Sequence, residues 1–367
     1  MKAILRTVTA TMLALVIGFA LAQTVTVRMA TLPYFDYMGF VGAEALGLDE
    51  EMGLDLEFVP FPLESPAIQA LARGSIDVGQ GALGSLVPLL PQAQDIRVVL
   101  NNVQFKGFVF VGREGGTATF EDLLAQHGGD FDAAQQATLQ QFEGKTILLV
   151  RSSFEGILKA SLEQVGLTLE DVEVLDFQND AQAAAAFLRG TGDLYTGSLP
   201  QQIRILREPG FVAVAGNEVL GPAGLWFSNT FVTDAYLEEN RDTVLRLNAV
   251  YYRFMRYLHE APEIALPPMI DFLNEQAAAG LSYEEALYLR DEFEDFTTVE
   301  GAAERVYDEN SPTYWRIAMD NFVDQNEALG NIEPGSVDAD RVVVQQELFN
   351  ELLANQELMD WINSPLD

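Results

Sequence analysis

Apolar and polar positions alternate with two different periods along the first half of the chain. Short apolar runs predict strands, and the segment after each run carries apolar residues three or four positions apart, as one face of a helix does. In the first block the expected strands and helices are, in chain order, Thr24–Ala30, Phe40–Leu48, Leu54–Pro60, Pro66–Arg73, Asp77–Gln80, Leu83–Leu90 and Arg97–Val103. Strands that alternate with helices at this spacing indicate βαβ units, so we predict an α/β fold with mostly parallel sheets.

The same alternation returns in a second block, after a polar stretch at His127–Gln141 that we expect to be a surface insertion. The second set of strands and helices is expected at Thr146–Val150, Phe154–Val165, Val172–Phe177, Ala181–Leu188, Leu194–Thr196, Pro200–Arg207 and Phe211–Ala215. Two helix starts carry capping signals. Ser65 stands directly before Pro66, and Ser152 is followed three positions later by Glu155, which predicts a helix cap and a capping box.

The two blocks repeat each other at an offset of 116 residues. Ala70–Asp77 matches Ala186–Asp193, and Gly81–Leu83 matches Gly197–Leu199. In both copies a helix ends at a glycine, a short strand carries an aspartate at its start, and small residues open the next helix. We therefore predict two related α/β lobes.

The last third of the chain has a helical pattern. One further strand is expected at Trp226–Val232, and an amphipathic helix follows over Asp234–Glu260. More helices are expected at Glu263–Ala279, Tyr283–Phe293, Pro312–Asn326 and Val342–Leu353. Their acidic faces are typical of solvated helix surfaces.

The first residues have the features of a secretory signal peptide. Lys2 and Arg6 precede an apolar run over Met12–Leu21, and the small residues Ala20 and Ala22 flank Leu21 as in a cleavage site. We expect residues 1–22 to be removed after Ala22, and an uncleaved membrane anchor is the alternative. No later stretch is apolar enough to span a membrane. The mature protein is therefore expected in the periplasm, with no lipid anchor.

Composition excludes several classes of function. The chain of 367 residues carries 55 acidic and 21 basic residues, a formal net charge of −34, and such a surface repels nucleic acids. There is no cysteine, which removes disulfides, thiolate metal sites and cysteine nucleophiles. With only two histidines, His127 and His259, neither a histidine-rich metal site nor a histidine-based triad is expected. No phosphate loop or nucleophile motif stands out, so we predict no metal, no cofactor and no catalytic residues.

Several segments resemble the solute-binding proteins of ABC importers. The similarity is to the nitrate, sulfonate and taurine family, which also includes binding proteins for pyrimidine precursors of thiamine. It rests, in chain order, on Leu32–Phe35, Glu44–Leu48, Met52–Val59, Ala67–Gly79, Phe142–Ile147, Leu162–Val174 and Glu238–Glu263. Together these segments span about residues 24–280.

The resemblance implies a two-lobed clamshell, the type II fold of periplasmic binding proteins. Lobe one would comprise residues 23–110 and 225–281, and lobe two residues 111–224, with crossovers near Phe108–Gly112 and Gly221–Trp226. Residues 282–367 would form a helical extension packed on lobe one. The ligand would bind between the lobes, where the carboxyl ends of the strands face the cleft.

Candidate ligand contacts stand in the loops that follow the expected strands. In the first lobe they are Tyr34, Phe35, Asp36, Ser65, Gln80, Ala82 and Phe105, with Trp226 directly after the second crossover. In the second lobe they are Ser152, Ser153, Phe154, Asp180 and Ser198. The aromatic residues would stack on a planar ligand, and the hydroxyls and carboxylates would take its polar atoms.

The charges in these loops bear on the ligand. Asp36, Glu64, Glu155 and Asp180 outnumber the basic residues there, which favours a flat nitrogen heterocycle or an amine. The serines at a helix N-terminus instead suit a sulfonate, nitrate or carboxylate, so both classes stay open.

The resemblance implies a monomeric, non-catalytic binding component that delivers a small solute to a membrane permease. One alternative is an enzyme on the same fold, since pyrimidine synthases of this type use a lysine-bound cofactor and an active-site histidine. Against it, His127 lies in the expected insertion, His259 lies in a C-terminal helix, and only Lys106 is near a crossover. A second alternative is a ligand-sensing module for a membrane receptor.

Overall fold

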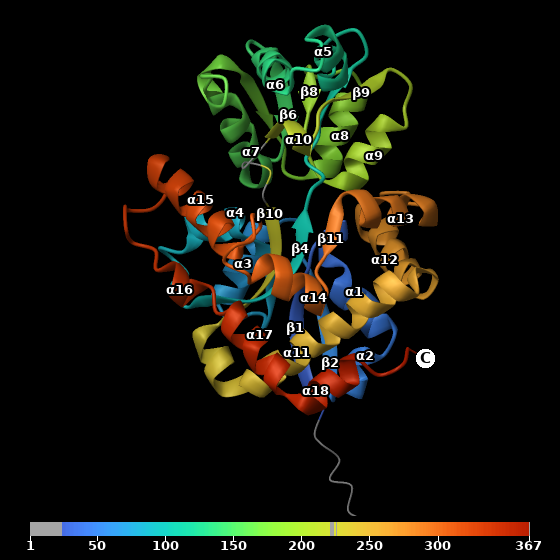
Figure 1. Cartoon of the computed structure of the whole chain (residues 1–367), viewed down its shortest axis with the longest axis vertical. Coiled ribbons are helices and arrows are strands. Elements are labelled where there is room, and N and C mark those ends of the chain that lie inside the picture. Colours follow the sequence, from blue (N-terminus) through green and yellow to red (C-terminus); the bar gives the residue numbers. More distant parts are fainter. Residues whose placement is uncertain (1–23, 221–223, 225, 367) are drawn as a thin grey trace, which may run out of the picture.

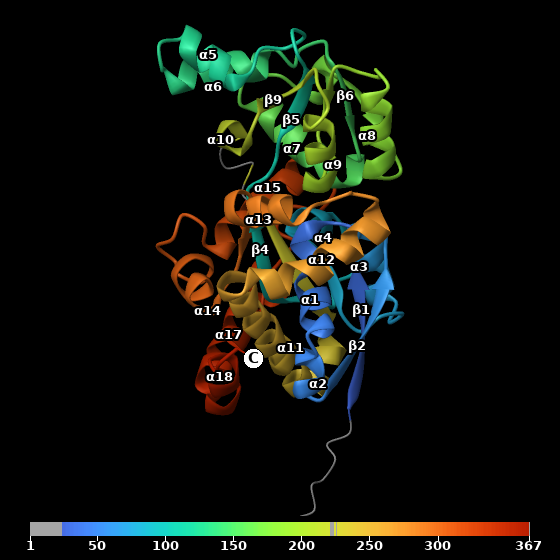
Figure 2. The same cartoon turned by 90° about the vertical axis from the view of Figure 1, so that its right-hand side faces the viewer.

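The computed structural model describes residues 24–220, 224 and 226–366. The predicted signal peptide, residues 1–22, lies outside the described residues, as does most of the predicted second crossover. The described chain forms two lobes, one above the other, joined by narrow connections (Figures 1 and 2).

Lobe one contains two sets of strands. β1 (Val25–Thr31) pairs in parallel with β2 (Leu54–Pro60). A second sheet has the order β11 (Glu294–Phe296), β4 (Ile96–Phe105), β10 (Trp226–Thr233) and β3 (Gly79–Ala82), with every neighbouring pair antiparallel. A single parallel bridge between Met29 and Val78 joins the two sets.

Helices cover both faces of these strands (Figure 1). From the N-terminal part come α1 (Gly39–Ala45), α2 (Leu48–Glu51), α3 (Glu64–Ala72) and α4 (Leu83–Leu86). From the later part come α11 (Asp234–Glu260) and α12 (Pro262–Ala277). The apolar face of α11 packs on α1, α12 and β4, which places the predicted amphipathic helix at the centre of the core.

Lobe two has one sheet of five strands. Its order is β7 (Glu173–Asp176), β6 (Thr146–Leu149), β8 (Leu194–Tyr195), β5 (Phe110–Arg113) and β9 (Phe211–Ala215). The helices around it are α5 (Phe120–Gln126), α6 (Phe131–Gln140), α7 (Arg151–Glu163), α8 (Asp180–Leu188), α9 (Leu199–Leu206) and α10 (Asn217–Leu220).

The sheets are mixed, whereas the alternation of strands and helices predicted mostly parallel ones. In lobe two, β6 is parallel to β7 and β8, but β5 is antiparallel to β8 and β9. The reason lies in the connections between lobes. β5 follows β4 directly across the cleft, with no helix between them, and β10 returns from lobe two into the sheet of lobe one. Because these strands are not joined by a helical crossover within one sheet, they can pair antiparallel.

The internal repeat has a structural counterpart in the two lobes. The backbone N–H of Arg28 on β1 donates to Asp77 Oδ2 at 2.9 Å, and the N–H of Thr146 on β6 donates to Asp193 Oδ2 at 2.9 Å. Gly74 and Gly190, which end the preceding helices, have φ of 69° and 102°. This hydrogen bond ties the segment before β3 to β1 in lobe one, and the segment before β8 to β6 in lobe two.

Both predicted caps were wrong. α3 begins at Glu64, one residue before Ser65, and α7 begins at Arg151, so Ser65 and Ser152 lie inside the first turn. Neither helix has a side-chain cap. The N-cap positions are Leu63 and Val150. Both have extended backbones, and the first turn of each helix begins directly after them.

Two other expectations need correction. The stretch at residues 127–141 is largely exposed, as predicted, but it is not only surface: it holds α6, whose Ala134 and Leu139 are fully buried. The helix expected at Phe40–Leu48 is broken in two, since Gly47 adopts φ of 72°, in the left-handed region.

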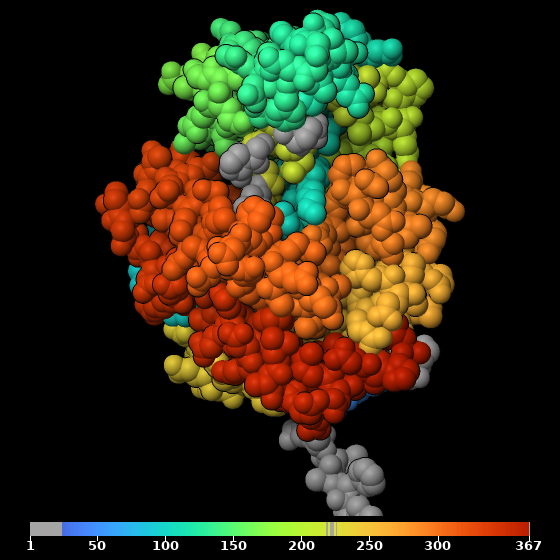
Figure 3. All heavy atoms as spheres, in the orientation of Figure 1, coloured from blue at the N-terminus to red at the C-terminus, as the bar shows by residue number. Residues whose placement is uncertain are grey.

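The C-terminal helices cover one face of lobe one (Figure 3). They are α13 (Tyr283–Glu292), α14 (Val299–Gly301), α15 (Trp315–Ala328), α16 (Ala339–Val342), α17 (Gln345–Ala354) and α18 (Gln356–Ile362). α17 packs on β4 and α11, and α18 packs on α11. α15 also reaches lobe two, where the Gln325 amide donates to the Gly156 carbonyl at 3.4 Å.

None of the described helices is both long enough and apolar enough to cross a membrane.

Candidate functional site

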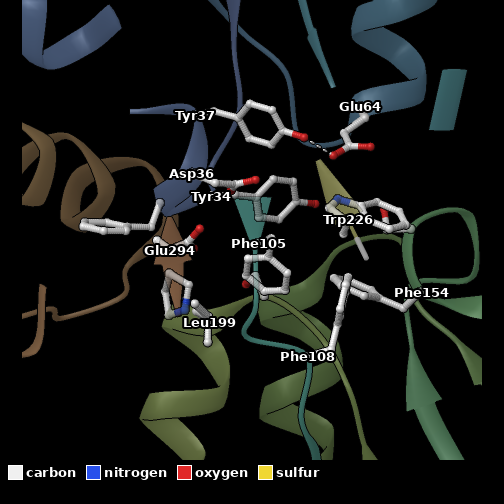
Figure 4. Close-up of a pocket in the computed structure, with 14 residues that line it drawn as sticks. Tyr34, Asp36, Tyr37, Glu64, Phe105, Phe108, Phe154, Leu199, Trp226 and Glu294 are labelled. Atoms are coloured by element: carbon white, nitrogen blue, oxygen red, sulfur yellow. Dashed lines mark hydrogen bonds between the residues drawn. The ribbon is translucent and has the colours of Figure 1, made fainter. Parts of the chain in front are cut away.

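A pocket lies between the two lobes, at the level of the crossover from β4 to β5 (Figure 4). It has a volume of about 40 Å³, and we call it the inner pocket. Its lining comes from both lobes: Tyr34, Phe35, Asp36, Tyr37, Glu64, Phe105, Phe108, Ser153, Phe154, Ser198, Leu199, Pro200, Trp226 and Glu294. The position between lobes follows from the fold, because loops at strand ends and helix N-termini meet there.

Lobe one contributes the loop after β1, the first residue of α3, the end of β4 and the start of β10. The loop carries Tyr34 to Tyr37 within a single 3₁₀ turn at Phe35–Tyr37, so consecutive side chains spread around the pocket. Lobe two contributes the first turn of α7 and the first residues of α9. Phe108 comes from the crossover itself.

Aromatic rings form the wall on the crossover side. Phe108 packs edge-on against three rings, with centroid separations of 4.6 Å to Phe105, 5.4 Å to Trp226 and 6.4 Å to Phe154. Trp226 is supported from behind by Phe322 of α15 at 5.3 Å. Such edge-to-face contacts stabilise a defined arrangement of rings, so this wall is preorganised.

Carboxyl groups enter the inner pocket from two directions: Glu64 lies beside Trp226, and Asp36 and Glu294 lie on the other side of Tyr34 (Figure 4). Asp36 is buried and accepts a hydrogen bond from Ser228 Oγ. Tyr37 donates to Glu64 Oε1 at 2.5 Å, while Glu64 Oε2 is buried without a hydrogen-bond partner. Burial raises the pKa of Asp36 to about 7 and also raises the pKa of Glu64.

The third carboxylate, Glu294, comes from the C-terminal part of the chain. It lies on β11, whose pairing with β4 sets Glu294 opposite Phe105. Its exposed fraction is 2%, and Oε2 has no hydrogen-bond partner. Burial and then the nearby charge of Asp36 raise its pKa well above the ordinary value. Nothing in the local sequence marks this residue, because a three-residue strand gives no periodic signal.

No lysine, arginine or histidine belongs to the lining of the inner pocket. The basic residues nearest to it in the sequence have carboxylate partners elsewhere: Lys106 pairs with Asp295 at 3.3 Å, and Arg151 pairs with Glu155. An anion in this pocket would lack a counter-charge and would face three carboxyl groups. A cationic or N–H-rich group would find acceptors and aromatic faces.

A second cavity, the outer cavity, adjoins the inner pocket through Tyr34 and Ser198, which line both. Its volume is about 490 Å³. The lining comprises Thr31, Leu32, Pro33, Tyr34, Pro60, Phe61, Pro62, Asn179, Asp180, Ala181, Ser198, Gln201, Phe272, Gln276, Ala277 and Ala278. These residues also come from both lobes.

Asp180 is the buried carboxylate of the outer cavity. It accepts hydrogen bonds from Tyr195 Oη at 2.8 Å, from the Ser198 N–H at 2.7 Å and from Ser198 Oγ at 2.5 Å. Burial raises its pKa to about 6, and these hydrogen bonds oppose the shift. Asp180 therefore holds the start of α9 in place as well as facing the cavity.

The structure brings most of the predicted contacts together. Those that line the inner pocket are Tyr34, Phe35, Asp36, Phe105, Ser153, Phe154, Ser198 and Trp226, and Asp180 lines the outer cavity. Four predicted contacts line neither: Ser65, Gln80, Ala82 and Ser152. Ser65 and Ser152 lie in the first turns of α3 and α7, because both helices begin earlier than predicted. Gln80 and Ala82 are buried in β3.

Several lining residues were not among the predicted contacts. They are Tyr37, Glu64, Phe108, Leu199, Pro200 and Glu294, of which Glu64 was noted only for its charge. Tyr37 and Glu64 stand beside predicted contacts, and the adjacent aromatic and acidic positions were a usable signal. Within residues 24–220, 224 and 226–366 there is no cluster of histidine, aspartate and glutamate able to hold a metal ion.

Comparison with known proteins agrees with this architecture. No protein-family model matches the chain. A protein of Brucella abortus whose name describes it as a binding protein is 27% identical over 262 residues, which cover 70% of this chain and 74% of the relative. A Brucella suis protein with the same description matches to the same extent.

Solved structures with the same fold include binding proteins for anions. The alkanesulfonate-binding protein of Xanthomonas axonopodis pv. citri, bound to MOPS, has a TM-score of 0.62 at 18% identity, over 88% of this chain and 99% of that one. The nitrate-binding protein of Synechocystis PCC 6803 has a TM-score of 0.66 at 14% identity, over 93% and 92%. The predicted periplasmic-binding-protein fold is therefore confirmed, and the resemblance to sulfonate- and nitrate-binding proteins is matched in structure.

Proposed function

We propose that this chain is the extracytoplasmic solute-binding component of an ABC importer. The fold and the pocket between its lobes support this role, as do the periplasmic sulfonate- and nitrate-binding proteins of the same fold. In this role the lobes, residues 23–110 with 225–281 and residues 111–224, close on the ligand as a monomer. The closed form then docks on a membrane permease.

We further propose that the solute is a cationic amine or a nitrogen heterocycle rather than an oxyanion. The observation that carries this is the composition of the inner pocket: the carboxyl groups of Asp36, Glu64 and Glu294, several aromatic rings, and no basic side chain among the described lining residues. Aromatic faces attract cations, and buried carboxylates need a partner that donates hydrogen bonds.

A catalytic role has less support. His259 Nε2 contacts the Phe296 carbonyl at 3.2 Å, and Lys106 is paired with Asp295 at 3.3 Å. Neither residue lines the inner pocket, and His127 ends α5 at the far side of lobe two. Lys106 and His259 do line one separate cavity of about 230 Å³, which shares Glu294 with the inner pocket, but the lysine is paired with Asp295 and the histidine with a backbone carbonyl.

The test is a thermal-shift screen of residues 23–367. The panel sets nitrate, taurine and alkanesulfonates beside aminopyrimidines, flavins and small amines. A ligand present at about a thousand times its Kd raises the unfolding free energy by about 4 kcal/mol, which is a clear shift. Stabilisation by amines or heterocycles supports the proposal, and stabilisation by the oxyanions alone overturns the proposed ligand class.

A further inference from the structure

The inner pocket and the outer cavity differ greatly in size. The inner pocket measures about 40 Å³ and the outer cavity about 490 Å³. The inner pocket is therefore the tighter of the two spaces and accepts only a small group of the solute. A larger solute must extend beyond it.

The acceptor atoms in the inner pocket point to the chemistry of the group that enters it. Glu64 Oε2 and Glu294 Oε2 are buried and have no hydrogen-bond partner, and each lies in the lining. Buried acceptors without partners are rare, because each costs free energy that a donor recovers. A primary ammonium group supplies N–H donors to such acceptors, whereas a quaternary ammonium supplies none.

The outer cavity has a different character. Pro33, Pro60, Phe61 and Phe272 give it apolar walls, and amide side chains such as Gln276 stand at its edge. Only Asp180 among its lining residues is charged, and its two carboxylate oxygens already accept three hydrogen bonds. This cavity suits an uncharged body with some polar atoms.

We propose that the solute has two parts: a primary ammonium head that donates to the carboxyl groups of the inner pocket, and an uncharged, mainly apolar body that passes Tyr34 and Ser198 into the outer cavity. The inference rests on the proposed function, since it specifies the solute of the same site. It adds that the outer cavity is a binding subsite which selects for the length of the solute.

The experiment compares ethylammonium, butylammonium and 4-phenylbutylammonium by calorimetric titration. Ethylammonium fills the inner pocket only, and the phenylbutyl chain reaches the outer cavity. We expect the affinity to rise by about tenfold or more from ethylammonium to 4-phenylbutylammonium, because each buried methylene adds favourable transfer free energy.

A filled outer cavity should remove this gain. Gln276 lies on the exposed side of α12 and lines the outer cavity, so Gln276→Trp occupies the space without disturbing the core. The matched control is Glu275→Trp, since Glu275 is the exposed neighbour and lines neither cavity. We expect Gln276→Trp to weaken 4-phenylbutylammonium about tenfold while ethylammonium is unchanged, and Glu275→Trp to leave both unchanged.

The outcomes separate this inference from the proposed function. Equal affinities for all three amines, or equal weakening of the short and long amines by Gln276→Trp, overturn the two-part solute and leave the cationic ligand class standing. Absence of binding by every amine, combined with binding of an oxyanion, overturns both.

Discussion

Glu64 and Asp180 hold equivalent positions in the two lobes, 116 residues apart. Each is the first residue of its helix, α3 or α8, and each is buried at the cleft. The N–H of Ser198 donates to Asp180, and the N–H of Ala82, the equivalent residue, stabilises the charged form of Glu64. The internal repeat has thus placed one carboxylate in each half of the cleft.

The two carboxylates differ in what remains free. Both oxygens of Asp180 accept hydrogen bonds within lobe two. Glu64 Oε1 accepts one from Tyr37, and Oε2 has no partner at hydrogen-bond geometry, although the Ser85 hydroxyl and the Ala82 N–H lie close enough to favour the charged form of Glu64. At these equivalent positions, Asp180 therefore mainly stabilises the start of α9, whereas Glu64 retains an oxygen that can accept a hydrogen bond from a ligand.

Glu64→Gln should weaken the binding of ethylammonium by about ten- to a hundredfold, because a hydrogen bond to a charged group contributes about 1.5–3 kcal/mol. Calorimetric titration measures the change. Glu57→Gln is the control, since Glu57 is an exposed residue of β2 that lines neither cavity. Unchanged affinity in Glu64→Gln would remove Glu64 from the site.

The affinity for an amine should fall as the pH falls from 8 to 5. Asp36, with a pKa of about 7, loses its charge over this range, and burial also raises the pKa of Glu64. A bound cation lowers these pKa values, so binding near pH 7 should also release protons, seen as a dependence of the binding enthalpy on the buffer. An oxyanion ligand would show the opposite trend, with tighter binding at pH 5.

The free energy of unfolding of the ligand-free protein should fall as the pH rises, which is opposite to the trend expected for the affinity. The pKa of Asp36 is about 7 in the folded protein and near 3.8 when unfolded, so the folded state binds more protons between these values. The contribution of Asp36 to the free energy of unfolding therefore falls as the pH rises from about 4 to 7, and is constant above that.

Urea unfolding across this pH range measures the slope. Asp36→Asn should reduce it, whereas Asp132→Asn, at an exposed position of α6, should leave it unchanged. Equal slopes in Asp36→Asn and the native protein would show that other carboxylates govern the pH dependence.

Ligand binding should change the fluorescence of Trp226. This ring lines the inner pocket between Phe108 and Phe322, whereas the other two tryptophans, Trp315 and Trp361, line neither cavity. Trp226→Phe should abolish the signal, and Trp361→Phe should retain it. A ligand-induced signal that survives in Trp226→Phe would place the ligand elsewhere.

Gly197→Ala should destabilise the protein by about 1–3 kcal/mol, because a Cβ there would approach Tyr195 Oη at 2.1 Å and Asp180 Oδ1 at 2.2 Å. Chemical denaturation measures the loss. Gly156→Ala in the middle of α7 is the contrasting variant. Its Cβ would meet only the flexible Gln325 amide at 3.3 Å, and alanine favours the helix, so its stability should be equal or higher. Equal effects in both variants would contradict the close packing around Asp180.

Local pattern sufficed for much of the fold. The helix at Asp234–Glu260 and the strands at Leu54–Pro60 and Phe211–Ala215 have the predicted bounds, because their periodicity comes from one buried face over several residues. The repeat and the strand-end loops also indicated where a cleft would form. The aromatic and acidic residues after β1 could thus be predicted to face it.

Tertiary structure alone decided the rest. Glu294 enters the inner pocket because β11 pairs with the end of β4, a contact between residues about 190 positions apart that leaves no local trace in the sequence. The early starts of α3 and α7 kept Ser65 and Ser152 out of both cavities, since helix ends depend on how the chain leaves the preceding strand or loop. The sequence determined which segments could line a cleft, and long-range pairing decided which side chains meet there.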